Sequence, residues 1–231
     1  MRKNSIGNDI IALTNTDIQR ACNPCFYSKF LTSEELALFD KNGFAIPFVQ
    51  FVWLCWSIKE SVYKFQKRLQ PELLRGGWKI QLQEINPSAT PSSFFQKDTL
   101  PESNFIPAGF CYSSVAIVNA EKYYSWSVIT TAFIHTITAG KGDYENVHWG
   151  VKKIDGVNRK KQSAEVRKSL LQKLSSLYGS HNYEVLKTST GIPYVNQFPQ
   201  IPVSFTHDDA FVAYALLLPN NKTMRTGIDT V

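Results

Sequence analysis

The sequence contains no uninterrupted apolar run of about 18 residues, which is the length a helix needs to cross a membrane. Its first residues are basic, but the apolar run behind them is short and contains Asp9. That pattern is not typical of a secretory signal peptide. We therefore expect a cytoplasmic protein without a membrane partner.

Cysteine is scarce, with Cys22, Cys25, Cys55 and Cys111 the only examples. Cys22 and Cys25 have the spacing of zinc ligands, but no second cysteine pair or histidine pair follows them. This absence disfavours a structural zinc site. We expect ordinary reduced thiols.

Several motifs of common enzyme classes are also missing. The sequence has no Gly-x-Ser-x-Gly elbow and no cysteine–histidine arrangement at a recognisable spacing, so nucleophilic hydrolysis lacks support. It has no Walker-type or Rossmann glycine pattern either.

Acidic residues are fewer than basic ones, and the formal net charge is +6. This balance favours an anionic partner: nucleic acid, an acidic protein surface or a phosphate-rich cofactor. The basic stretch 152–168 is not interleaved with stacking aromatics and matches no nucleic-acid-reading motif. We interpret that stretch as solvated surface and expect no nucleic-acid partner.

The first 70 residues predict a strand followed by two helices. A short isoleucine-rich run predicts a buried strand over 6–13. Thr32 and Glu35 form a capping box that opens a short helix, which Gly43 ends as a left-handed cap. From Phe48 to about Arg68 the chain is nearly all apolar apart from a charged stripe, which predicts a central, largely buried helix.

Strand patterns dominate the rest of the chain. Period-two alternation predicts strands from Trp78, near 115–118 and near 126–129, while 86–108 and 140–162 are interpreted as irregular. Ser163 is expected to cap a helix that Gly179 ends, and strands near 183–187, 201–206 and 210–218 follow. The fold class is therefore α/β of the α+β type, in two mixed halves, 1–140 and 150–231.

Two carboxylates and one lysine are the first candidates for a functional site. Asp9 interrupts an apolar strand, and Glu60 and Lys64 lie one turn apart on an otherwise apolar helix. Two carboxylates from different elements form a minimal Mg²⁺ site, and an ammonium group suits the phosphates that such an ion holds. The alternatives are that Asp9 caps a turn at a strand end, and that Glu60 and Lys64 are a stabilising pair on a helix surface.

His207 is the third kind of candidate, because it lies at the end of an apolar strand that runs from Val203. The alternative interpretation is a histidine whose hydrogen bonds are satisfied at a strand end.

These residues resemble the motifs of the 4′-phosphopantetheinyl transferase superfamily. Members carry Gly-x-Asp-Ile or Val on a strand, as at Gly7 to Ile10, and Trp-x-x-Lys-Glu-Ser-x-x-Lys on a helix, as at Trp56 to Lys64. They also carry Gly-x-Pro followed by a strand ending in Ser-His or similar; Gly191 to Pro193 and Ser204 to His207 are similar to that.

The resemblance implies transfer of the 4′-phosphopantetheine group of coenzyme A to a serine hydroxyl of an acidic acyl or peptidyl carrier protein. It implies that Asp9 and Glu60 hold Mg²⁺ and that Glu60 takes the serine proton. Lys64 and Lys59 would contact phosphate. His207 and Thr206 would contact the nucleotide, and Gly191 and Pro193 would shape its adenine pocket. The alternative is a degenerate member that binds coenzyme A or a carrier protein without turnover.

The order of the motifs is reversed relative to the two-lobed, surfactin-synthetase-type members and matches the short holo-acyl-carrier-protein synthases. We interpret the chain as two pseudo-symmetric lobes in swapped order, each a small, mostly antiparallel sheet on a long helix; a short-type protein with an insertion is the alternative. Three positions depart from the family pattern. Ile11 replaces the third acid of two-lobed members, Ile192 stands where many relatives have lysine, and Thr206 where many have serine.

Overall fold

The structure is a computed structural model that describes residues 4–15, 18–74, 80–88, 110–155, 158–179 and 181–219. It combines helices with antiparallel sheets, which confirms the predicted fold class. Most of the predicted loop 86–108, and the first residues of the strand predicted from Trp78, lie outside the described residues.

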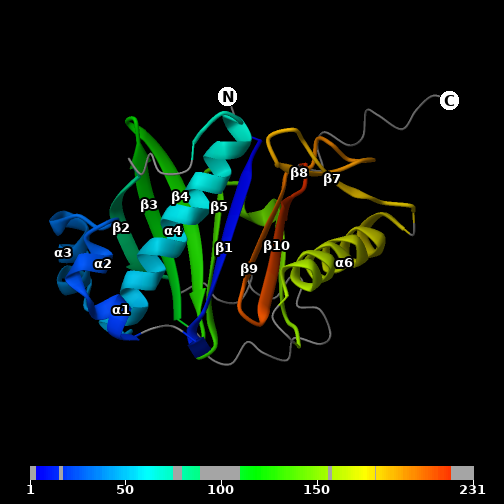
Figure 1. Ribbon diagram of the computed structural model, residues 1–231. Coiled ribbons are helices and arrows are strands. Elements are labelled where there is room, and N and C mark those ends of the chain that lie inside the picture. The colour runs from blue at the N-terminus through cyan, green and yellow to red at the C-terminus, as the bar shows by residue number, and fades with distance from the viewer. Residues whose placement is uncertain are drawn as a thin grey trace.

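The first half of the chain forms a five-stranded antiparallel sheet with the order β1-β5-β4-β3-β2 (Figure 1). The first strand in the chain is therefore an edge strand, paired with the last strand of this sheet. The strands are β1 (Ile6–Ala12), β2 (Gln81–Pro87), β3 (Phe110–Val118), β4 (Glu121–Ile129) and β5 (Phe133–Ala139).

Helix α4 (Phe48–Leu69) crosses one face of this sheet (Figure 1). Phe51, Leu54, Ile58, Val62 and Phe65 recur at helical spacing and are all nearly or fully buried, which confirms the predicted central helix. Three helices pack at its N-terminal end: α1 (Ile18–Cys22), α2 (Pro24–Tyr27) and α3 (Ser33–Asn42).

The termini of α3 are those that the sequence predicts. The Thr32 hydroxyl accepts from the Glu35 amide, and the Glu35 carboxylate accepts from the Thr32 amide. Gly43 ends the helix in the left-handed conformation, with φ of 54°.

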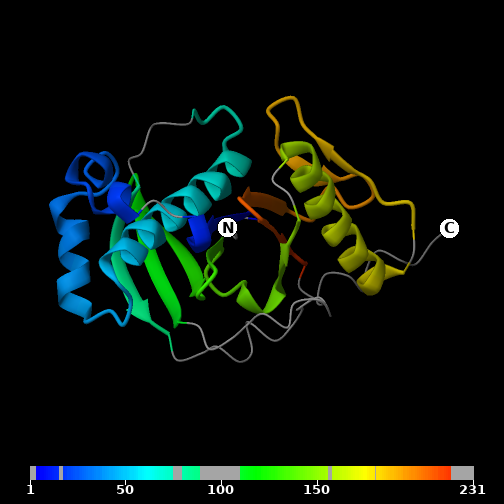
Figure 2. The same ribbon diagram turned by 60° about the horizontal axis from the view of Figure 1, so that its bottom comes forward.

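The second half forms a three-stranded antiparallel sheet with the order β6-β10-β9, and helix α6 (Arg159–Tyr178) covers its outer face (Figures 1 and 2). A small hairpin joins α6 to this sheet. The strands are β6 (Val147–Lys153), β7 (Val185–Lys187), β8 (Pro193–Val195), β9 (Val203–Asp208) and β10 (Phe211–Leu217).

Two predictions for this half are wrong. The stretch 140–162 is not irregular, because it contains β6, and α6 begins at Arg159 rather than at Ser163. The cap is Asn158, whose side chain accepts a hydrogen bond from the Lys160 amide. Glycine and lysine residues weaken the apolar alternation of β6, so the sequence pattern did not predict this strand. Val147 and Trp149 do alternate, and both are buried between the two sheets.

The two sheets share a core and also meet along β1 and β9. Ile6, Ile10 and Ile137 of the first sheet pack in one cluster with Trp149 and Phe211 of the second. Along the edge, the constant register between β1 and β9 shows that the strands run parallel. Side-chain oxygens, however, take the place of main-chain carbonyls. Ser204 accepts from the Asn8 amide, Thr206 from that of Ile10 and Asp208 from that of Ala12.

Gly7 sets the distance between β1 and α4. A Cβ atom at this position would lie 2.0 Å from the Ser61 carbonyl oxygen and 2.6 Å from the Phe65 amide nitrogen. Both are backbone atoms of the helix, so neither can move without shifting α4. The glycine of the Gly-x-Asp motif is therefore required, because any side chain at this position would collide with the backbone of α4.

No helix among the described residues is long and apolar enough to span a membrane.

We predict that Gly7→Ala lowers the free energy of unfolding by about 3 kcal/mol or more, because the new methyl group forces β1 away from α4. Urea denaturation followed by circular dichroism measures this. Gly43→Ala is the control: its added methyl meets no atom within 4 Å, and only the left-handed backbone costs about 1 kcal/mol. Equal effects of the two substitutions would contradict the close-contact explanation.

His135 on β5 gives a prediction for the pH dependence of stability. Its ring is 2% exposed and lies 5.1 Å from the Trp149 ring. Burial, and then the Lys64 charge, lower its pKa to about 3. The unfolded chain binds this proton near pH 6.5 and the folded protein does not, so acidification below that pH destabilises the fold.

The free energy of unfolding should therefore decrease less between pH 6.5 and pH 4 when His135 is replaced with glutamine. The difference from wild type should be about 3 kcal/mol. Unfolding free energies measured across this range test it. His181→Gln is the control, because His181 is exposed. A variant curve parallel to wild type would show that His135 does not supply this pH dependence.

Candidate active site

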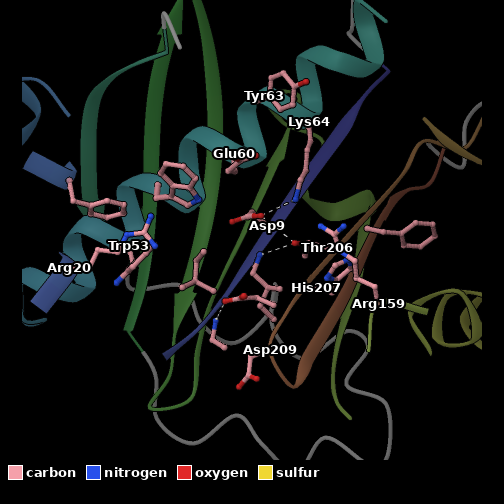
Figure 3. A pocket seen from close by; sticks show the side chains of 17 residues that line it. Asp9, Arg20, Trp53, Glu60, Tyr63, Lys64, Arg159, Thr206, His207 and Asp209 are labelled. Atoms are coloured by element: carbon pink, nitrogen blue, oxygen red, sulfur yellow. Dashed lines mark hydrogen bonds and ion pairs between the residues drawn. The ribbon is translucent and has the colours of Figure 1, made fainter. Parts of the chain in front are cut away.

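A cleft of about 820 Å³ lies where α4, β1 and β9 meet, and it contains three of the sequence candidates for metal and phosphate, Asp9, Glu60 and Lys64. Thr206 and His207 from β9 line it as well. Figure 3 shows Asp9 between Lys64 and Thr206, with Glu60 on the α4 side. Residues nearly two hundred positions apart therefore share one site.

Asp9 is the most constrained group in the cleft. It is 7% exposed, and its Oδ1 accepts from Lys64 Nζ at 2.8 Å and from Thr206 Oγ1 at 3.2 Å (Figure 3). Its Oδ2 is buried and has no hydrogen-bond partner among the described residues. A buried carboxylate oxygen without a partner is costly, and a bound cation would satisfy it.

Glu60 reaches the same cleft from α4 and is 4% exposed. Its i,i+4 spacing from Lys64 places both side chains on the stripe that faces β1. In the structure Lys64 forms its ion pair with Asp9 and also donates to the Asn8 carbonyl at 2.9 Å. The alternative of a Glu60–Lys64 pair on a solvated helix surface does not describe the structure, because Glu60 is buried and Lys64 pairs with Asp9.

The two carboxylates suit an ion such as Mg²⁺, which takes part of its coordination shell from water and substrate. They suit less well an ion that needs a full set of protein ligands. Within the described part of the chain, no three Asp, Glu, His or Cys side chains are grouped so that they could hold an ion. Mg²⁺ commonly uses one or two carboxylates and completes its shell with water and substrate phosphates. Asp9 and Glu60 match that arrangement, and Ile11 contributes no ligand.

A second cavity of about 280 Å³ adjoins the first and contains Gly191, Pro193 and several basic side chains. Lys64 and His207 line both cavities, so they stand at the junction between them. The basic side chains that line only the second cavity are Lys67, Arg68, Arg167 and Lys187.

Burial lowers the pKa of His207, and the charges of Lys64 and Arg159 lower it further. A histidine in this cationic surrounding is a natural partner for an anion, because a bound phosphate would favour its protonated form.

Arg68 holds the turn that carries Gly191 and Pro193 against α4. Its guanidinium donates to the carbonyl of Pro193 at 2.9 Å and to that of Val203. Burial lowers its pKa to about 10, and its Nε has no partner among the described residues. This N–H lies in a residue that lines the second cavity, where an anion could accept from it.

The structure does not bring Lys59 to either cavity. Lys59 is 3% exposed, and its ammonium donates to the carbonyls of Phe30 and Ile80 and pairs with Glu35 at 2.7 Å. These partners use all three N–H donors of the ammonium. Lys59 therefore joins α3 and the start of β2 to α4 instead of contacting a cofactor.

Sequence reasoning missed several residues that line the cavities, among them Arg20, Trp53, Arg68 and Arg159. Trp53 and Arg68 could have been predicted from their positions, since helical spacing places both on the same face as Glu60 and Lys64. Arg159 lies in the basic stretch interpreted as solvated surface. Only the path of the chain into α6 shows that it borders the cleft (Figure 3).

We predict that Lys59→Met lowers the free energy of unfolding by about 3–5 kcal/mol, because it leaves the buried Glu35 carboxylate without its partner. Coenzyme A should bind the folded variant with unchanged affinity. Lys64→Met, one turn later on the same helix, should show the opposite pattern: weaker cofactor binding and a smaller loss of stability. Calorimetric titration and urea denaturation separate the two, and weakened binding in Lys59→Met alone would restore a cofactor role for Lys59.

One of the comparisons with known proteins gave a match. Residues 5–118, about half of the chain, match the family model of the 4′-phosphopantetheinyl transferase superfamily. The matched segment contains β1 with Asp9 and α4 with Glu60 and Lys64. Neither the curated proteins nor the solved structures gave a significant match. Segment 5–118 is thus identified as a domain of the 4′-phosphopantetheinyl transferase superfamily.

Proposed function

We propose that this protein transfers the 4′-phosphopantetheine group from coenzyme A to a serine hydroxyl of an acyl or peptidyl carrier protein, with a Mg²⁺ ion held by Asp9 and Glu60. The observation that carries the proposal is the unpartnered, buried Oδ2 of Asp9 in a cleft that also contains Glu60, Lys64 and His207.

The two cavities suit the two ends of coenzyme A. The diphosphate would lie at their junction, where Lys64 and His207 border both. The nucleotide would occupy the smaller, basic cavity, with Gly191 and Pro193 beside the adenine and Lys67, Arg167 or Lys187 near the remaining phosphate.

The pantetheine arm would follow the opposite wall of the larger cleft. That wall is aromatic: Phe26 and Trp53 have ring centroids 5.5 Å apart, and Trp56 lines the cleft beside them. Trp53 Nε1 is buried and has no partner among the described residues. An amide carbonyl of the arm is a suitable acceptor for this indole N–H.

The carrier protein would approach the open side of the cleft. Carrier proteins are expected to be acidic, and Arg20 and Arg159 line the cleft on opposite sides of Asp9 (Figure 3). The excess of basic residues, 25 against 19 acidic ones, favours the same encounter.

In the transfer step, the serine oxygen attacks the phosphorus that bears the pantetheine arm, and the bond from that phosphorus to the bridging oxygen breaks. Adenosine 3′,5′-bisphosphate leaves. Glu60, directly or through a water, takes the serine proton. Lys64 and His207 hold phosphate oxygens in place, and bound Mg²⁺ would supply neutralisation of the charge on the diphosphate.

We also propose that residues 1–140 and 150–231 are the two lobes of the two-lobed family members in swapped order. The support is that each half has its own antiparallel sheet and one long helix, α4 or α6. The family match lies in the half with the metal-binding candidates.

Asp9→Asn and Glu60→Gln, made singly, should each reduce transfer by more than about 100-fold, because each removes a charged metal ligand. The assay incubates the protein with an apo-carrier protein, coenzyme A and Mg²⁺ and detects the mass gained by the carrier. Asp40→Asn is the control, since this carboxylate is exposed and lines neither cavity. No mass gain with wild type across several carriers, together with measurable coenzyme A binding, would favour a degenerate binding protein.

His207→Asn should raise the KM for coenzyme A by about tenfold and leave kcat nearly unchanged, because it removes one phosphate contact without touching the metal. Steady-state kinetics at saturating carrier measure both constants. An unchanged KM would rule out the phosphate contact proposed for His207.

A further inference from the structure

We infer that Thr206 is a positioning residue for Asp9 and does not contact the nucleotide. This inference rests on the proposed function, because the orientation it explains is that of a metal-binding carboxylate. It differs from the role that the family resemblance implies for the same residue.

The position of Thr206 follows from the parallel register of β1 and β9. Ser204, Thr206 and Asp208 form three successive rungs, each accepting one amide hydrogen of β1. The middle rung differs from the other two. Thr206 Oγ1 accepts from the Ile10 amide at 3.3 Å and also lies 3.2 Å from Asp9 Oδ1.

The direction of the second bond is fixed by the chemistry of the groups. The Ile10 amide is a donor only, and an ionised carboxylate is an acceptor only. The single hydroxyl proton of Thr206 therefore points to Asp9. Both bonds are long, so we expect each to contribute little to the stability of the fold.

The orientation decides which oxygen faces a metal. Thr206 and Lys64 both donate to Oδ1, from β9 and from α4. Two donors on one oxygen limit rotation of the carboxylate, and Oδ2 is left as the oxygen without a hydrogen-bond partner among the described residues. Metal ligands generally depend on such hydrogen-bonding partners for their orientation.

Threonine suits this role better than serine. Its β-branched side chain has fewer accessible rotamers, and Thr206 is 6% exposed, so the hydroxyl is held in one place. A serine would keep both hydrogen bonds with more rotational freedom.

The test compares Thr206→Val, which has nearly the same shape but no hydroxyl, with Thr206→Ser and with Ser204→Ala. The last variant removes the neighbouring rung, which holds the Asn8 amide and does not contact Asp9. Mn²⁺ is the probe, and its Kd is measured by electron paramagnetic resonance without coenzyme A. Urea denaturation of each variant measures stability separately.

We expect Thr206→Val to weaken Mn²⁺ binding by about tenfold, Thr206→Ser to stay within about threefold of wild type, and Ser204→Ala to leave the Kd unchanged. Unchanged Mn²⁺ affinity in Thr206→Val would overturn the inference. If the same variant also had a raised KM for coenzyme A, the result would favour a contact between Thr206 and the nucleotide. Equal weakening in Thr206→Val and Ser204→Ala would also overturn it, because the loss would then follow from the ladder as a whole.

The proposed function fails in a different way. If wild type binds Mn²⁺ no better than Asp9→Asn does, there is no metal at Asp9 and both proposals fall. If wild type binds Mn²⁺ through Asp9 and Thr206→Val binds it equally well, the proposed function stands and the positioning role does not.

Discussion

The contact between the backbone of β1 and the backbone of α4 at Gly7 is the constraint on which the site depends. Glycine leaves no Cβ between the strand and the Ser61 carbonyl, so the strand lies directly on the helix. Two residues later on the same face, Asp9 is brought within 2.8 Å of Lys64 and into the cleft that Glu60 lines. A wider separation would leave the lysine unable to compensate the buried charge of Asp9, which is expensive to bury alone.

The other edge of β1 explains why the second half of the chain is needed. The amides of Asn8, Ile10 and Ala12 face away from β5 and would be unpaired at a sheet edge. Side-chain oxygens of β9 satisfy them, so the two sheets are joined without forming one continuous main-chain ladder. Burial raises the pKa of Asp208, the last rung, and the charge of Asp9 raises it further, whereas the Ala12 amide opposes this. The same strand carries His207 to the junction of the two cavities.

Sequence patterns predicted the elements whose signal is local. The Thr32 capping box, the Gly43 cap and the buried helix from Phe48 depend on spacing within a few turns, and the structure has all three. The pattern of β6 was missed because its charged and glycine residues dilute the alternation that Val147 and Trp149 provide. Lys59 shows a different limit. Its spacing cannot reveal that Phe30, Glu35 and Ile80 converge on its ammonium, because that convergence depends on where α3 and β2 pack.

Charge explains why the metal site and the cofactor site should act together under the proposed function. Asp9 and Glu60 supply two negative charges and Lys64 returns one positive charge, so the unliganded group carries about one net negative charge if both carboxylates are ionised. A divalent cation reverses that sign. The diphosphate of coenzyme A would then neutralise the excess and supply the oxygens that the protein lacks, since no group of three Asp, Glu, His or Cys side chains among the described residues is arranged to hold an ion. Lys64 need not leave Asp9 for this to happen, because it occupies Oδ1, and Oδ2 is the oxygen without a hydrogen-bond partner among the described residues. The ion pair can therefore fix the carboxylate before the substrate arrives and remain in place while the phosphates bind.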